Sequence, residues 1–148
     1  MVGSLALHPI YLCKAMLPTM QKRKHRSAIV ITSSLFSLRA TAGNATYCAS
    51  KTFVSYLAEA LYYELKDHQI DCLNWIPGET STKMLRRREG GRVVSTDHAA
   101  KYMFRDIGKE VTSRGCIEHD VAGWFVDQVP TGMWNHLLRR ELDKIYAR

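Results

Sequence analysis

Residues 33–51, SSLFSLRATAGNATYCASK, are the most informative stretch of this sequence for its fold and function. Tyr47 and Lys51 are four residues apart, so on a helix their side chains share one face. Ser34 lies thirteen positions before Tyr47, across a loop of small and polar residues. An ammonium group about 4 Å from a phenol stabilises the phenolate by ~4 kcal/mol at an effective dielectric of about 20. Such a trio can move a proton onto a carbonyl oxygen and hold that oxygen, whereas the alternative is a packed tyrosine beside an ordinary surface lysine.

Two apolar runs flank this stretch and predict the fold. AIVIT (28–32) and IDCLNWI (70–76) have the continuous apolar character of strands buried on both faces of a parallel sheet. Between them, residues 44–67 predict a long helix whose packing stripe is Val54, Leu57, Leu61 and Leu65. Strand, helix and strand form a right-handed βαβ unit, so the sequence predicts an α/β fold with a parallel sheet.

The remaining helices are predicted from apolar density and caps. Residues 5–20 are apolar enough to predict a largely buried helix in which Tyr11, Leu12, Ala15 and Met16 pack beside the sheet. Ser95 or Thr96 can cap a further helix over residues 97–107.

The segment SAIVITSSLFSLRATAGNATYCASK (27–51) resembles the active-site region of the short-chain dehydrogenase/reductases. In that family a strand leads to a catalytic serine, and Tyr-x-x-x-Lys follows thirteen positions later. The resemblance implies that Ser34, Tyr47 and Lys51 are catalytic. It also implies that residues 1–148 form one partial domain, the C-terminal half of a Rossmann-like doubly wound sheet.

A second match lies after the second strand. Because the carboxyl ends of parallel strands meet at one edge, this loop and the Ser34 loop should line one crevice. PGETST (77–82) resembles the turn that holds the nicotinamide in the family. The implied cofactor is NADP(H), with NAD(H) as the alternative, bound by Tyr47, Lys51, Pro77, Gly78, Thr80 and Thr82.

Two elements of the family pattern are missing. The T-G-x-x-x-G-x-G turn that approaches the cofactor phosphates has no counterpart, since none of the nine glycines forms such a cluster. The first βαβ units are therefore expected to be absent. Leu5 stands where many members carry an asparagine of the proton relay.

TSRGCIEHDVAGWFVDQVP (112–130) resembles one branch of the family, the very-long-chain 3-oxoacyl-CoA reductases and their 17β-hydroxysteroid dehydrogenase relatives. This implies a lipid-like carbonyl substrate, either a 3-oxoacyl-CoA or a steroid, and a cytoplasm-facing place at the endoplasmic reticulum membrane. Residues 83–148 would supply a substrate-covering loop and the C-terminal helices, with His119 structural. Ordinary core packing is favoured over an acyl-covering or membrane-touching surface for Trp124, Phe125, Met133, Trp134 and Leu137.

Composition limits the other function classes. An apolar share of 46% and a charged share of 24% are those of a globular protein. The net charge of +7 lies in clusters that are typical of solvated turns, and nothing resembles a nucleic-acid module. Cys13, Cys48, Cys72 and Cys116 lack C-x-x-C spacing, so we expect buried thiols and no metal site. There is no signal-peptide pattern and no apolar run long enough to cross a bilayer.

Half of a doubly wound sheet would leave strand 28–32 with unpaired amides on one side. We therefore expect a marginal or aggregation-prone chain unless a partner chain completes the sheet, and a homodimer through the helix carrying Tyr47 and Lys51. Two functions follow. One is an oxidoreductase that needs the missing cofactor-binding half, and the other is a non-catalytic remnant acting as a structural or assembly subunit.

Overall fold

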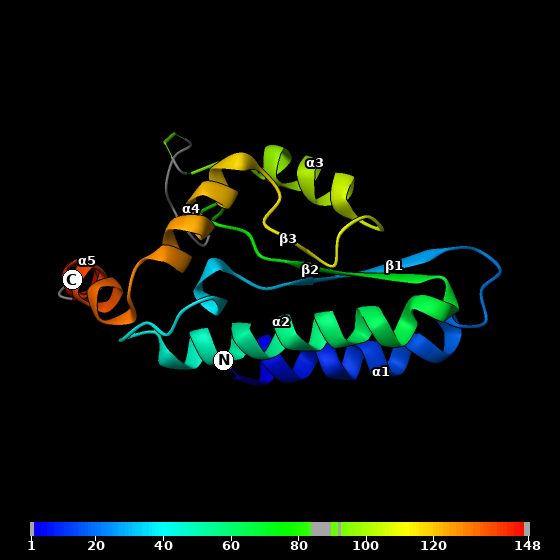
Figure 1. Cartoon of the computed structure of the whole chain (residues 1–148). Helices are drawn as coiled ribbons and strands as arrows, with labels where there is room; N and C mark the ends of the chain where they lie inside the picture. Colours follow the sequence, from blue (N-terminus) through cyan, green and yellow to red (C-terminus); the bar gives the residue numbers. More distant parts are fainter. Residues whose placement is uncertain (1, 84–89, 92, 147–148) are drawn as a thin grey trace.

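The computed structural model describes residues 2–83, 90, 91 and 93–146, with side chains as far as residue 139. Its described part contains a parallel sheet of three strands in the order β1-β2-β3 (Figure 1). The strands are β1 (Ser27–Thr32), β2 (Ile70–Trp75) and the short β3 (Thr112–Ser113). Ser27 of β1 is opposite Ile70 of β2, and Thr32 is opposite Trp75, so the two strands pair over their whole length.

The helices cover both faces of this sheet (Figure 1). On one face lie α1 (His8–Met20), which continues a π-helical turn Gly3–Leu7, and α2 (Ala45–Leu65), which ends in a 3₁₀ turn Lys66–His68. On the other face lie α3 (Thr96–Asp106) and α4 (Ile117–Gln128). The chain ends in α5 (Thr131–Tyr146).

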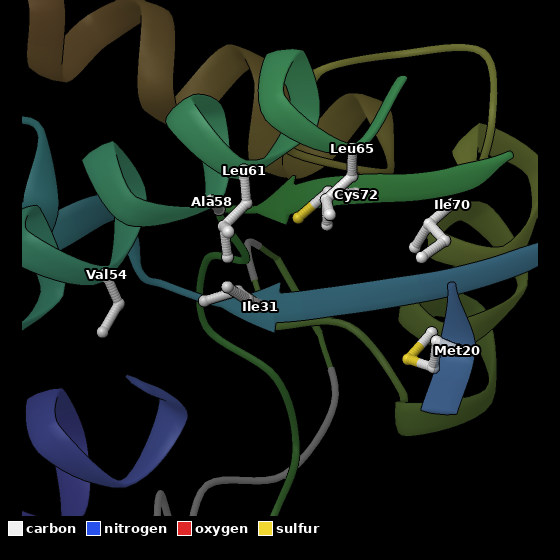
Figure 2. Close-up of a cluster of buried hydrophobic side chains, with 8 residues drawn as sticks. All are labelled: Met20, Ile31, Val54, Ala58, Leu61, Leu65, Ile70 and Cys72. Atoms are coloured by element: carbon white, nitrogen blue, oxygen red, sulfur yellow. The ribbon is translucent and has the colours of Figure 1, made fainter. Parts of the chain in front are cut away.

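The main core lies between α2 and the sheet. Figure 2 shows that its side chains come from α2, both long strands and the end of α1: Met20, Ile31, Val54, Ala58, Leu61, Leu65, Ile70 and Cys72. A smaller cluster on the opposite face joins Val94, Ala99 and Cys116 to Trp75 and Tyr102. Successive residues of β2 point to opposite faces, so this one strand contributes to both clusters.

The predicted α/β fold is confirmed. The strands predicted at 28–32 and 70–76 and the long helix between them are present, and α2 buries Val54, Leu61 and Leu65 on its packing stripe. The helix predicted at 97–107 is α3, and its cap is Ser95, whose Oγ accepts the His98 N–H at 3.0 Å.

Two packing predictions are wrong. Helix α1 is not largely buried, since Tyr11, Leu12 and Met16 are 66%, 49% and 44% exposed and Ala15 is also exposed. Dense apolar residues around a helix predict burial on all sides, but only its Cys13, Leu17 and Met20 side faces the core. The C-terminal apolar residues Trp124, Phe125, Met133 and Leu137 are likewise exposed rather than core.

Within the described residues, β1 pairs with β2 alone and forms an open edge of the sheet. Its outer row of N–H and C=O groups is the kind of edge that recruits another strand. No helix in the described ranges is long and apolar enough to span a membrane.

Candidate active site

Ser34 stands where β1 ends and the chain turns into a 3₁₀ segment, Leu35–Ser37. Its backbone is extended, with φ −168° and ψ 156°, and its Oγ accepts the Phe36 N–H at 3.3 Å. This cap holds the half-buried serine at the carboxyl end of the strand, the edge at which parallel sheets bind their ligands.

Tyr47 and Lys51 occupy the first two turns of α2. The Lys51 side chain is buried, and its Nζ donates a hydrogen bond to the Thr32 carbonyl at 2.9 Å, at the end of β1. The same Nζ lies 5.8 Å from the centroid of the Tyr47 ring. The Phe36 ring meets the Tyr47 ring edge-on at 6.0 Å, so the Ser34 loop contacts the tyrosine directly. Burial lowers the pKa of the Lys51 ammonium, which brings it closer to the range in which it exchanges protons near neutrality.

A group of hydroxyls holds the Ser34 loop against α2. Ser33 Oγ donates to the Lys51 carbonyl at 2.8 Å and accepts the Ser55 hydroxyl at 2.7 Å. Thr52 Oγ1 donates to the Ser37 carbonyl at 2.9 Å. Sequence reasoning missed the role of Ser33 and Thr52, because a hydroxyl that fixes a loop looks the same in sequence as one exposed to solvent.

The loop after β2 lies beside the Ser34 loop. The Leu35 N–H donates to the Pro77 carbonyl at 3.2 Å, and the Ser33 N–H donates to the Trp75 carbonyl at 2.7 Å. Gly78 is in contact with His119, since a Cβ built on this glycine would lie 2.6 Å from the imidazole Cδ2. His119 is 1% exposed and its Nε2 lies 3.3 Å from the Glu79 carbonyl oxygen, which agrees with a structural role.

Thr80 and Thr82 follow on the same loop. Thr80 Oγ1 donates to the Gly78 carbonyl at 3.4 Å, and Thr80 forms a parallel bridge with Val94. Thr82 is exposed. The Gly- and Arg-rich loop expected to cover the substrate lies partly outside the described residues, which omit 84–89 and 92.

The C-terminal helices form hydrogen bonds to the chain segment between Ser34 and Tyr47. Asn135 of α5 accepts the Ala42 N–H at 2.6 Å and donates to the Ala40 carbonyl at 3.0 Å, while the Trp134 indole donates to Thr41 Oγ1 at 2.9 Å. Arg39 donates to the Val126 and Asp127 carbonyls and to Thr131 Oγ1. Sequence reasoning missed these contacts, because about ninety residues separate the partners and no motif marks them.

A surface groove of about 1040 Å³ is lined by the first half of α2, by residues 40–42 and by α5. It is lined mainly by small and apolar residues such as Ala45, Cys48, Phe53 and Leu57, with Asn135 of α5 at one side. Ser34, Tyr47 and Lys51 are not among its lining residues, so the crevice expected above them stays a prediction.

The structure thus brings together a buried ammonium, a phenol and the loop of a strand-end serine. Lys51 links Tyr47 to the end of β1, and Phe36 links Tyr47 to the Ser34 loop. In chemical terms, a phenol close to an ordered lysine can act as an acid, and a hydroxyl nearby can hold the oxygen that takes the proton.

Known proteins resemble this chain in sequence. Residues 7–92 match the family model described as short chain dehydrogenase. Over 136 residues the chain is 27% identical to the very-long-chain 3-oxoacyl-CoA reductase of Anas platyrhynchos (duck). The aligned region covers 91% of this chain and 43% of the duck protein. The chain therefore spans less than half the length of that curated relative.

Solved structures resemble it in fold. A short chain dehydrogenase from Burkholderia cenocepacia in complex with NADP has a TM-score of 0.68 at 18% identity, over 84% of this chain and 54% of that one. NADPH-bound carbonyl reductase from chicken fatty liver has a TM-score of 0.60 at 22% identity, over 77% and 51%. The family match covers more than half of the chain and agrees with the observed βαβ unit. This chain belongs to the short-chain dehydrogenase family.

Proposed function

We propose that this chain is the catalytic half of an NADP(H)-dependent oxidoreductase that interconverts a carbonyl and an alcohol on a lipid-like substrate. One observation carries the proposal: the buried Lys51 ammonium is fixed to the Thr32 carbonyl at the end of β1, beside Tyr47. A buried lysine costs free energy, so an ordered one close to a phenol is a candidate for function. Ser34 leaves the same strand end two residues later.

Each residue has a distinct role in this proposal. Tyr47 donates its phenolic proton to the carbonyl oxygen as the carbon is reduced. Ser34 donates a hydrogen bond to the same oxygen and holds it. Lys51 stabilises the phenolate that Tyr47 becomes, and the phenol regains its proton from solvent. The Leu5 side chain cannot form hydrogen bonds. The water-linked proton relay of many relatives would therefore need a different residue here.

The residues proposed for the cofactor suit its nicotinamide end. When bound, NADP(H) would supply the hydride, with NAD(H) as the alternative. The Leu35–Pro77 hydrogen bond joins the two loops that would enclose the ring, and Pro77, Gly78, Thr80 and Thr82 lie on the second of them. The sequence holds no glycine-rich turn for the phosphates, so a further segment or chain must provide that half.

The substrate class rests on the similarity to the duck very-long-chain 3-oxoacyl-CoA reductase. We assign a 3-oxoacyl-CoA as substrate, with a steroid ketone as the alternative from the same branch. Residues 83–148 would cover it, and the exposed Trp124, Phe125 and Met133 are available to contact an acyl chain. A position at the endoplasmic reticulum membrane, facing the cytoplasm, belongs to the same proposal.

The test compares Tyr47→Phe with the unchanged chain, because this substitution removes only the hydroxyl. Oxidation of NADPH with a long 3-oxoacyl-CoA is followed for the full chain alone. It is then followed for the chain fused behind the cofactor-binding half of the duck reductase. We expect turnover in the fusion and a roughly 100-fold or larger loss with Tyr47→Phe. A fusion that binds NADPH and melts cooperatively, yet turns over equally well without the hydroxyl, would contradict the proposal.

A second function is favoured by the open edge of β1. In this alternative the chain is a structural or assembly subunit whose edge pairs with a strand of another chain. Phe53, Tyr56 and Tyr63 on the exposed side of α2 are 45%, 71% and 69% exposed and could bring two copies together as a homodimer. Two results together would favour the alternative: the chain forms a complex through these surfaces, and the fusion has no reductase activity.

A further inference from the structure

Three potential metal ligands meet on the side of the sheet opposite α2. They are His98 of α3, Cys116 immediately before α4, and Glu118 in the first turn of α4. Their ligand atoms, a ring nitrogen, a thiol sulfur and a carboxylate oxygen, all lie within 4.8 Å of one another. None of the three belongs to the proposed catalytic group, and their spacing in sequence matches no metal motif.

Two atoms of this cluster lie within ion-pair distance of each other but do not form a hydrogen bond. His98 Nε2 lies 3.4 Å from Glu118 Oε2, within ion-pair distance. Both atoms are buried, and neither makes a hydrogen bond in the described part of the chain. A tetrahedral ion with bonds of about 2.0–2.3 Å places its ligand atoms ~3.3–3.8 Å apart. The His98–Glu118 separation of 3.4 Å falls in this range, and the Cys116 sulfur lies within 4.8 Å of their ligand atoms. Buried polar atoms left without hydrogen bonds suggest that a binding partner is missing.

The surroundings hold the three ligands in place. Ser95 caps α3 through the His98 N–H at 3.0 Å, and the His98 ring lies 4.9 Å from the Tyr102 ring, centroid to centroid. Cys116 is 0% exposed and packs with Ala99 of α3, which joins the two helices. The side chains of His98 and Glu118 are 38% and 35% exposed, although their facing atoms Nε2 and Oε2 are themselves buried. An ion that reaches the cluster past these two side chains would take a water molecule as its fourth ligand.

We propose that His98, Cys116 and Glu118 form a structural zinc site that joins α3 to α4. A thiolate, a carboxylate and a neutral imidazole together balance the charge of Zn²⁺. The soft sulfur favours zinc over Mg²⁺ or Ca²⁺, which prefer oxygen ligands. The start of α4 favours negative charge, which helps to keep Glu118 ionised. Burial raises the pKa of the Cys116 thiol, so zinc binding has to displace its proton.

Cobalt is the probe for the test, because a Co²⁺–thiolate bond gives a charge-transfer band in the near ultraviolet. The full chain, freed of metal with a chelator, is titrated with Co²⁺ and then with Zn²⁺. We expect one Co²⁺ per chain, a thiolate band that Zn²⁺ abolishes, and a higher Tm with Zn²⁺. Cys116→Ser should remove the band, and His98→Gln and Glu118→Gln should each weaken Zn²⁺ binding roughly tenfold or more. Cys13→Ser, which changes a thiol outside the cluster, should change neither readout.

A band that persists in Cys116→Ser, or zinc binding that is equal in all variants, would overturn the site. If Cys116→Ser does not fold, His98→Gln decides, because that side chain is partly exposed and its loss leaves the core intact. Absence of any thiolate band in the unchanged chain also overturns the proposal.

Discussion

At the residue scale, the loop after β2 depends on Gly78 because this residue has no side chain. A Cβ at this position would lie 2.6 Å from His119 Cδ2 and 3.1 Å from Leu35 Cδ1. Both neighbours belong to the candidate site, because Leu35 lies on the Ser34 loop and the buried His119 contacts the loop after β2. The glycine therefore allows the two loops and α4 to come together.

We predict that Gly78→Ala lowers the free energy of unfolding by about 1–3 kcal/mol, the usual cost of overpacking. Thermal or urea unfolding measures this difference. Gly132→Ala is the matched control, because a Cβ there would meet no atom within 4 Å. Equal stability of the two variants would show that the contact with His119 relaxes without cost.

Cys72 couples the core to pH. It is 1% exposed, and burial raises the pKa of its thiol to about 12, with a smaller effect from Cys13. In the unfolded chain the thiol ionises near pH 8.5. Between these two pKa values the unfolded state has lost the proton that the folded state keeps, so stability falls as the pH rises.

The contribution of Cys72 is thus fully present below about pH 8.5 and is lost progressively toward pH 12. We predict that the unchanged chain loses stability more steeply than Cys72→Ala over this range. The measurement is the free energy of unfolding at several alkaline pH values. The two proteins are compared by how steeply the free energy of unfolding changes with pH. Its absolute value is not compared, because Cys72→Ala also loses packing and is less stable at every pH. Parallel slopes would refute the prediction.

At the element scale, α5 is attached to the chain segment that connects Ser34 to Tyr47. Asn135 makes the central contacts, since it accepts the Ala42 N–H and donates to the Ala40 carbonyl. The helix also leaves Met133 and Leu137 exposed. Polar contacts to loop 39–42 therefore contribute much to the docking of α5.

We predict that Asn135→Ala weakens this docking by roughly 1–3 kcal/mol, the sum of a few hydrogen bonds. Amide hydrogen exchange should become faster in α5 and in loop 39–42, while β1 and β2 remain protected. His136→Ala, an exposed neighbour on the same helix, should leave exchange unchanged. Uniformly faster exchange across the sheet would mean that Asn135 supports the whole fold instead.

At the scale of the whole molecule, the edge of β1 decides how the chain behaves in solution. The N–H groups of Ser27 and Ser33 point toward the β2 side, where they donate to the Gln69 and Trp75 carbonyls. Because backbone groups alternate along a strand, the N–H of Ala28 points to the open side. Together with the exposed apolar residues of α1, this edge predicts self-association.

We predict that the unchanged chain forms dimers or larger species, and that their share rises with protein concentration. Native mass spectrometry or light scattering measures this share. Ala28→Pro should reduce them and keep the fold, because it removes an outward N–H and leaves the pairing with β2 intact. Ile29→Pro, one residue on, removes an N–H directed at β2 and should unfold the chain. A monomeric, sharply melting wild-type chain would count against this prediction.

Local sequence patterns predict the parallel βαβ unit, with boundaries within a residue or two of those observed, and they also indicate the family. Both depend on local patterns: apolar runs at 28–32 and 70–76, and the spacing of Ser34, Tyr47 and Lys51. Other features are visible only in the folded chain: Lys51 is held by the Thr32 carbonyl, one side of α1 is exposed, and Asn135 forms hydrogen bonds to loop 39–42. Folding also brings His98 close to Cys116 and Glu118. The reason is physical: a local pattern records which face of an element avoids water, whereas contacts between distant residues depend on which elements come to lie against that face.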